Sequence, residues 1–287
     1  MINKKDIEKA KYEQDREDLP PVLKEIENQY TPEELKAIAK GGRIVPGQTK
    51  VPVVSFKGER IRIGVMSDTH FGSKYFVEKF FFQALDMFDK ENVDFIVHCG
   101  DVTDGLSNRP DHIYELNYIG YNAQKDYAKK LLKDIKKKVY MIDGNHDRYY
   151  IKNGGAIIVR DICEELGDNF IFLGHDEGDI SLDGNAILKI WHGIDGSSYA
   201  YSYRLQKLIE SFTGGEKPDV LITGHVHKCL YIFCRHVHCY GAGALSTQSK
   251  FMRGKKLENH TGFWIIDLFV GKKGVSKVTH SWYPFYA

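Results

Sequence analysis

Five short stretches of the chain carry side chains that bind metal ions, and most of them include a glycine. They read Asp68-Thr69-His70, Gly100-Asp101, Gly144-Asn145-His146-Asp147, Trp191-His192-Gly193 and Gly224-His225-Val226-His227. Without His146 and Asp147 they offer two aspartates, one asparagine and four histidines, enough for two metal ions that share one carboxylate. In two-metal hydrolytic sites the ions lie about 3.5 to 4 Å apart and together polarise a phosphoryl group. The residues therefore predict a dinuclear site that hydrolyses phosphate esters.

Each stretch lies at the end of an apolar run that predicts a strand, and ligands of open α/β sheets bind beyond the carboxyl ends of strands. Taken alone each stretch is weak evidence, because an Asp after a strand is usually a turn residue and a His is usually a surface or core residue. His225 and His227 are more specific, since alternate residues of an extended segment point the same way. The five together are a strong signal.

The elements that would position these residues alternate between strand and helix in the first part of the chain. The predicted strands are 61–66, 94–98, 139–142 and 169–173, and the predicted helices are 75–88, 121–137 and 156–166. This alternation favours parallel βαβ units.

The second part is richer in strands, predicted at 179–182, 186–192, 220–223, 230–234, 237–240, 263–269 and 275–282, with one helix at 203–212. Strand-rich sequence after a βαβ half predicts two sheets packed face to face with helices outside.

Residues 1–40 are expected to form a small helical extension, 41–60 a linker rich in glycine and proline, and 61–287 the catalytic domain. Thr31, Pro32 and Glu33 are typical of a helix start. For the extension we favour a solvated helical arm that packs on the main domain over a helix-turn-helix that touches nucleic acid.

The composition is that of an ordinary globular protein, with 42% hydrophobic and 28% charged residues and a net charge of +1 that does not indicate a partner. Five cysteines without framework spacing and the absence of a signal-peptide pattern favour the cytoplasm, and no apolar run is long enough to span a bilayer. The cysteines between 229 and 239 lack the spacing of a zinc site, so buried side chains are expected there.

In this order, Asp68-x-His70, Gly100-Asp101, Gly144-Asn145-His146-Asp147, His192 and Gly224-His225-x-His227 resemble the full signature of the calcineurin-like metallophosphoesterase superfamily. The resemblance covers about residues 61–250. It implies an α/β fold, a four-layer α/β/β/α sandwich of two packed mixed sheets. It also implies two divalent metal ions, with manganese preferred over iron, zinc or magnesium.

Carried over by position, the resemblance assigns Asp68, His70 and His227 to one ion, Asn145, His192 and His225 to the other, and Asp101 to both as a bridge. It makes His146 a catalytic residue that faces the substrate, and Asp147 a residue that orients or tunes the His146 imidazole. The nucleophile would be a metal-bound hydroxide.

The resemblance also bears on the substrate. Protein phosphatases of the superfamily carry an arginine in Gly-Asp-x-x-Asp-Arg-Gly, whereas this chain reads Gly100-Asp-Val-Thr-Asp104-Gly105. The pattern is more similar to phosphodiesterases, to the nuclease subunit of double-strand-break repair complexes, to small subunits of archaeal replicative polymerases and to phage-encoded proteins.

Four residues near the motifs are candidates for substrate binding: Arg109 in the loop after Asp101, Tyr199 after His192, and Lys250 and Arg253 in a basic stretch. Tyrosines can stack on bases and cations can follow a nucleic-acid backbone. The alternatives are a solvated loop arginine, a core tyrosine and a solvated basic loop.

Three functions are compared. The first is a phosphodiesterase on nucleic acid, a nuclease or exonuclease of DNA repair or replication, with nucleic acid as substrate and a homodimer or a replication or repair protein as partner. The second is a phosphomonoesterase or phosphoprotein phosphatase. The third is a structural subunit of a polymerase, which would be expected to lose ligands.

Overall fold

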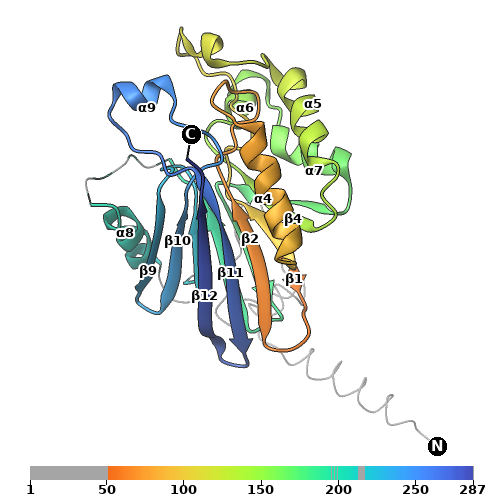
Figure 1. Cartoon of the computed structure of the whole chain (residues 1–287), viewed down its shortest axis with the longest axis vertical. Helices are drawn as coiled ribbons and strands as arrows, with labels where there is room; N and C mark the ends of the chain where they lie inside the picture. Colours follow the sequence, from red (N-terminus) through yellow and green to blue (C-terminus); the bar gives the residue numbers. More distant parts are fainter. Residues whose placement is uncertain (1–50, 195, 197, 199, 213–216, 287) are drawn as a thin grey trace, which may run out of the picture.

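The computed structural model describes residues 51–194, 196, 198, 200–212 and 217–286, which form two six-stranded sheets (Figure 1). The expected helical extension 1–40 and the first half of the expected linker lie outside the described residues. The second half of that linker contains β1 (Val53–Val54) and the first residue of β2 (Arg60–Met66).

The first sheet has the strand order β12-β11-β2-β3-β4-β5. Strand β2 and the strands β3 (Phe95–His98), β4 (Lys138–Asp143) and β5 (Phe170–His175) are parallel. Strand β11 (Gly262–Gly271) runs antiparallel to β2, and β12 (Gly274–Pro284) closes the edge. Because β2, β3 and β4 are parallel, the first three candidate metal-binding stretches meet at one edge of this sheet.

The second sheet has the order β1-β6-β7-β8-β10-β9. Its remaining strands are β6 (Glu177–Leu182), β7 (Ala186–Trp191), β8 (Val220–Thr223), β9 (Cys229–Cys234) and β10 (Val237–Ala242). Strands β7, β8 and β10 are parallel. The ends of β7 and β8 therefore bring His192 and the His225 to His227 segment to the same edge.

Between the sheets lies an apolar core, because alternate residues of each strand point to the same face. Ile61, Ile63 and Val65 of β2 and Leu188 and Ile190 of β7 are among its members and are fully buried. On the outer face of the first sheet lie α4 (Glu78–Lys90), α5 (Tyr121–Leu132) and α7 (Ile158–Leu166), and on that of the second lies α8 (Tyr203–Ser211) (Figure 1). The predicted four-layer α/β/β/α sandwich of two mixed sheets is confirmed.

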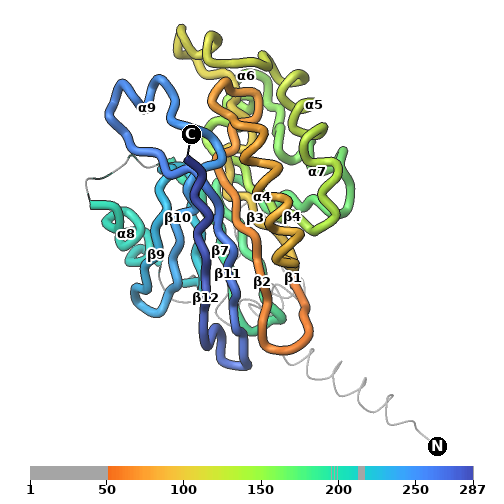
Figure 2. Tube along the Cα trace, viewed as in Figure 1, coloured from red at the N-terminus to blue at the C-terminus, as the bar shows by residue number. Residues whose placement is uncertain are grey.

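Some elements differ from the prediction. Helix α5 ends at Leu132 rather than near residue 137. The chain turns after Leu132, and Ile135 is buried in the core. Three short helical elements were not expected: η1 (His112–Glu115), α6 (Tyr149–Gly154) and α9 (Lys250–Gly254). Helices α6 and α9 lie at the same end of the sheets (Figure 2).

No helix among the described residues is long and apolar enough to cross a membrane.

Candidate metal centre

The first candidate metal group consists of Asp68, His70 and His227, whose ligand atoms converge. Asp68 Oδ1 lies 3.1 Å from His227 Nε2, and the Nε2 atoms of His70 and His227 lie 3.3 Å apart. All three residues are buried.

The second candidate group consists of Asp101, His192 and His225, with Asn145 beside them. His192 Nε2 lies 3.2 Å from Asp101 Oδ2 and 3.2 Å from Asn145 Oδ1. The rings of His192 and His225 are in edge contact, with centroids 5.2 Å apart.

Asp101 stands between the two groups. Its Oδ2 atom lies 3.2 Å from His192 Nε2 and 3.8 Å from His70 Nε2, so one carboxylate oxygen faces a histidine of each group. This geometry is compatible with a carboxylate that bridges two metal ions.

Three of the candidate ligand histidines are held through Nδ1. His70 Nδ1 donates to Asp104 Oδ1 at 2.8 Å, His192 Nδ1 to the Cys99 carbonyl at 2.7 Å, and His227 Nδ1 to Asn259 Oδ1 at 2.7 Å. Hydrogen bonds of this kind fix the tautomer and orient the ring of metal-binding histidines. Each Nε2 lone pair is therefore directed towards the centre.

These residues fit divalent metal ions. The Nε2 atoms of His70 and His227 face each other although both rings already donate through Nδ1, so neither nitrogen brings a proton to the contact unless one ring is charged. A cation between them satisfies both lone pairs. Imidazole, carboxylate and amide donors together suit manganese, iron or zinc.

The electrostatics of the centre agree with this fit. Burial alone raises the pKa of the Asp101 carboxyl, but the His192 and His146 rings hold that pKa well below its ordinary value. Burial lowers the pKa of His225 to about 4, which keeps this imidazole neutral, the form that binds metals. Burial also lowers the pKa of His192, but Asp101 outweighs it and raises the value to about 9. A bound cation would replace the protons that these histidines otherwise share with the carboxylates.

The backbone at the centre is strained. Asp68, His70 and Asp101 each have φ of 49°, His225 has 73° and His227 has 54°. These left-handed conformations are rare for residues other than glycine, cost about 1–3 kcal/mol each, and cluster at functional sites.

The glycines beside the candidate ligands are explained by close approach. A Cβ atom at Gly144 would lie 2.2 Å from Asp101 Oδ1, and one at Gly224 would lie 2.5 Å from the Cys99 carbonyl oxygen. Side chains at these positions would therefore push the stretches apart.

His146 is half-buried beside the first group, with its ring 4.6 Å from that of His70 in an edge contact. Its Nδ1 donates to the Asp104 carbonyl at 2.8 Å, and Asp104 Oδ1 lies 3.3 Å away. Burial opposes protonation, but Asp101 and Asp104 raise the pKa of this imidazole well above its ordinary value.

Asp147, the expected partner of the His146 imidazole, points elsewhere. Its carboxylate accepts hydrogen bonds from the amides of Val102, Thr103 and Gly144 at 2.7–3.0 Å, and from the Thr103 hydroxyl at 2.8 Å. Asp147 thus ties the loop after β3 to the loop after β4, and the contact with the imidazole belongs to Asp104.

Asp104, His112 and Asn259 were missed as site residues. Asp104 stands in the Gly100-Asp101-x-x-Asp104 motif, so spacing carried a signal for it. His112 Nδ1 accepts from the Ser107 amide at 3.0 Å, so its Nε2 carries the proton and donates to Asp104 Oδ2 at 3.2 Å. Asn259 lies 32 residues beyond His227, and no spacing indicated it.

Both groups open into a cleft of about 820 Å³, lined by His70 and His227 of the first and Asp101 and His225 of the second. The loop around Arg109, η1 and the α9 segment complete its lining. Arg109 lines this cleft but is paired with Glu115 and Asp111, at 2.6 and 3.0 Å. Lys250 lies 4.0 Å from Asp111 and is exposed.

The other substrate-binding predictions have different outcomes. Arg253 lies on α9, but neither Arg253 nor Lys250 is among the described residues that line the cleft, whereas Lys255 is. Tyr199 lies outside the described residues.

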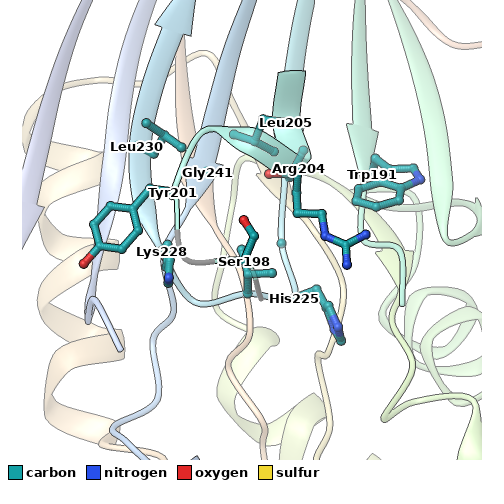
Figure 3. Close-up of a pocket in the computed structure, with 12 residues that line it drawn as sticks. Trp191, Ser198, Tyr201, Arg204, Leu205, His225, Lys228, Leu230 and Gly241 are labelled. Carbon is teal, nitrogen blue, oxygen red and sulfur yellow. The ribbon is translucent and has the colours of Figure 1, made fainter. Parts of the chain in front are cut away.

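A second, much smaller cavity of about 30 Å³ has His225 among its lining residues (Figure 3). Its lining side chains come from α8, the segment before it and the ends of β7, β8 and β9, and include Trp191, Arg204 and Lys228. It is too small for a substrate. The large cleft is the candidate active site because candidate metal ligands line it.

Residues 61–229 match the model of the calcineurin-like phosphoesterase family, and the chain belongs to this family. It is 27% identical over 248 residues to the DNA polymerase II small subunit of Methanothermobacter thermautotrophicus, covering 71% of this chain and 51% of that protein. Against the DNA polymerase II small subunit of Archaeoglobus fulgidus it is 27% identical over 249 residues, covering 72% and 49%. The chain spans about half the length of these curated relatives.

Among solved structures, an archaeal phosphodiesterase aligns with 78% of this chain and 100% of its own, at 21% identity and a TM-score of 0.44. A phosphoesterase from E. coli aligns with 76% and 98%, at 16% identity and a TM-score of 0.43.

Proposed function

We propose that this protein is a dinuclear metal-dependent phosphodiesterase that hydrolyses nucleic acid. The observation that carries the proposal is the convergence of seven candidate ligands, from five stretches between Asp68 and His227, into two adjacent groups with Asp101 facing both. Two divalent ions bound there would polarise a phosphoryl oxygen and activate water.

The chain's own residues have separate tasks in this reaction. Asp68, His70 and His227 would hold one ion, Asn145, His192 and His225 would hold the other, and Asp101 would contribute to both. Asp101 and Asp104 raise the pKa of His146, which favours the charged form of its imidazole. A charged imidazole can stabilise the phosphoryl charge or protonate the leaving oxygen. Asp104 acts through its carbonyl as the positioning residue for that ring.

Three observations support nucleic acid as the substrate. The cleft of about 820 Å³ has room for more than one phosphate, and the cations Arg109, Lys152 and Lys255 line it. The arginine of the protein phosphatase motif is absent, with Gly105 in its place. The curated relatives are small subunits of DNA polymerase II. A replication protein is the partner that these relatives suggest.

A structural role beside a polymerase is the second candidate, and it is favoured by the names of the same relatives. The complete ligand set argues against it, because a subunit without catalysis would be expected to lose ligands. The strained backbone around the buried Asp101 carboxylate also argues against it, because strain of this kind clusters at functional sites. Among the described residues that line the cleft, none specifically favours a phosphomonoesterase.

The test is turnover with added manganese on labelled single-stranded and double-stranded DNA, with His146→Ala prepared in parallel. Cleavage by the wild type and not by the variant is expected, and shortening from one end would make it an exonuclease. Hydrolysis of a small phosphomonoester without cleavage of DNA would favour the phosphatase. Purified protein without bound metal and without either activity would favour the structural role.

A further inference from the structure

Phe251 on α9 is an exposed aromatic ring in the wall of the cleft. Its exposed fraction is 44%, although it is a large apolar residue beside a polar site. Two cations lie over the ring: the Arg109 guanidinium carbon at 5.3 Å and the Lys255 Nζ at 4.6 Å from its centroid. A single-strand binding site combines an aromatic ring that stacks on a base with cations that contact the backbone. The Phe251 ring and its two cations supply both components beside the candidate metal centre.

The two cations differ in how firmly they are held. Arg109 is fixed by ion pairs with Asp111 and Glu115, which lie close to it in the chain. Lys255 forms no ion pair within 4.0 Å with any carboxylate of the described residues, so its partner there is the Phe251 ring. A phosphate is a stronger partner for an ammonium group than a ring face is. Transfer of Lys255 to a phosphate would uncover part of the ring.

The segment that presents this pair is closed on itself. We call residues 248–257 the α9 strap. Gln248 Nε2 donates to the Leu257 carbonyl at 2.6 Å, and the Leu257 amide donates to the Met252 carbonyl at 2.9 Å. The Ser249 hydroxyl caps α9 by accepting from the Met252 amide at 3.2 Å. The ring is therefore presented by an ordered backbone, which lowers the entropy cost of binding.

We propose that Phe251 and Lys255 form a nucleotide subsite of the cleft, in which an unpaired base stacks on the Phe251 ring and Lys255 binds an adjacent phosphate. The subsite rests on the proposed function, which supplies nucleic acid as the ligand. It specifies single-stranded nucleic acid, because the bases of a duplex are already stacked on their neighbours. It is tolerant of sequence, because every base has a face that can stack.

The experiment measures binding without turnover. Fluorescence anisotropy in EDTA would give the Kd of a fluorescein-labelled oligothymidylate and of the same strand with abasic sites. For the wild type we expect binding of the oligothymidylate about tenfold tighter than of the abasic strand. Phe251→Leu should bind both strands equally, and Lys255→Gln should weaken both and reduce the dependence of Kd on salt.

Two variants are matched controls. Phe233→Leu alters a ring that is 57% exposed on β9, outside the cleft, and Lys272→Gln alters the turn between β11 and β12 at the far end of the sheets. Both should bind like the wild type. The subsite is refuted if Phe251→Leu keeps the preference for the base-bearing strand, or if the wild type has none.

Failure of the subsite is distinguishable from failure of the proposed function. Hydrolysis of bis(p-nitrophenyl) phosphate with manganese would be measured on the same wild-type protein. Hydrolysis without base preference would overturn the subsite alone. Base preference that depends on Phe251, without hydrolysis of either DNA or the small diester, would overturn the enzyme and retain the subsite.

Discussion

At the scale of single residues, Asp104 links three imidazoles. Its side chain accepts from His70 and His112, and its carbonyl accepts from His146. The family resemblance assigned the orientation of the His146 imidazole to Asp147, the next residue in the chain. Neighbours in an irregular loop do not share a direction, however, and the Asp147 carboxylate instead satisfies backbone amides on both loops. Candidate ligands were readable from motifs, whereas the partners that orient them depend on tertiary contacts.

Replacement of Asp104 by Asn should lower turnover by about 10- to 100-fold, a typical cost of losing a group that orients a metal-bound histidine. The amide keeps the shape but replaces one carboxylate oxygen with a donor that cannot accept from His70 or His112. Steady-state kinetics with metal content measured in parallel would check this. Asp126→Asn, an exposed position on α5, is the matched control. Wild-type turnover in Asp104→Asn would contradict the assignment.

Replacement of His146 by Ala should retain the bound metals and lower turnover by about 10²- to 10⁴-fold, the usual contribution of a general acid. The metals should be retained because the His146 imidazole belongs to neither predicted ligand set, although it contacts the His70 ring. Elemental analysis and single-turnover assays would separate the two effects. Loss of metal from the variant would instead make His146 a ligand.

At the scale of elements, apolar runs predicted the long strands because burial between two sheets demands them. They did not predict α9 or α6, which are each about a turn or two long and depend on contacts made by neighbouring loops rather than on an apolar face. Within α9 no residue is buried, so no periodicity marked it as helical. The basic stretch at 250–256 therefore looked like a loop.

Helix α8 is held by burial of one face, and Ile209→Ala should destabilise the protein by about 2–5 kcal/mol. Ile209 is fully buried in a cluster with Leu205 of α8 and Leu221 of β8. Urea unfolding would measure the change. The neighbouring exposed position, Glu210→Ala, should stay within about 0.5 kcal/mol of wild type. A similar small change for Ile209→Ala would mean that α8 does not pack on the sheet.

At the scale of the whole molecule, the candidate ligands come from both sheets. Asp68, Asp101 and Asn145 follow strands of the first sheet, and His192 and His225 follow strands of the second. Ions at the centre would therefore join the two halves of the sandwich at the edge where the apolar core ends.

Removal of metal should lower the melting temperature. Ligands that bind only the folded state stabilise it by about 2.7 kcal/mol at a concentration 100 times Kd. Scanning calorimetry with EDTA, and then with manganese restored, would measure the shift. Asp101→Asn, which removes the shared carboxylate, should show little response to manganese. An equal response in that variant would argue against a bridge.

The bond from His227 Nδ1 to Asn259 Oδ1 has a consequence at the mouth of the cleft. Asn259 follows the α9 strap by two residues, and its amide nitrogen donates to the Ser246 carbonyl just before the strap begins. A metal ion bound to His227 would therefore restrain both the His227 ring and the base of the strap. Hydrogen exchange of the Leu257 amide should slow when manganese is added, and Asn259→Leu should abolish this response. Metal binding at the centre and ordering of the strap that carries Phe251 and Lys255 would then be thermodynamically coupled.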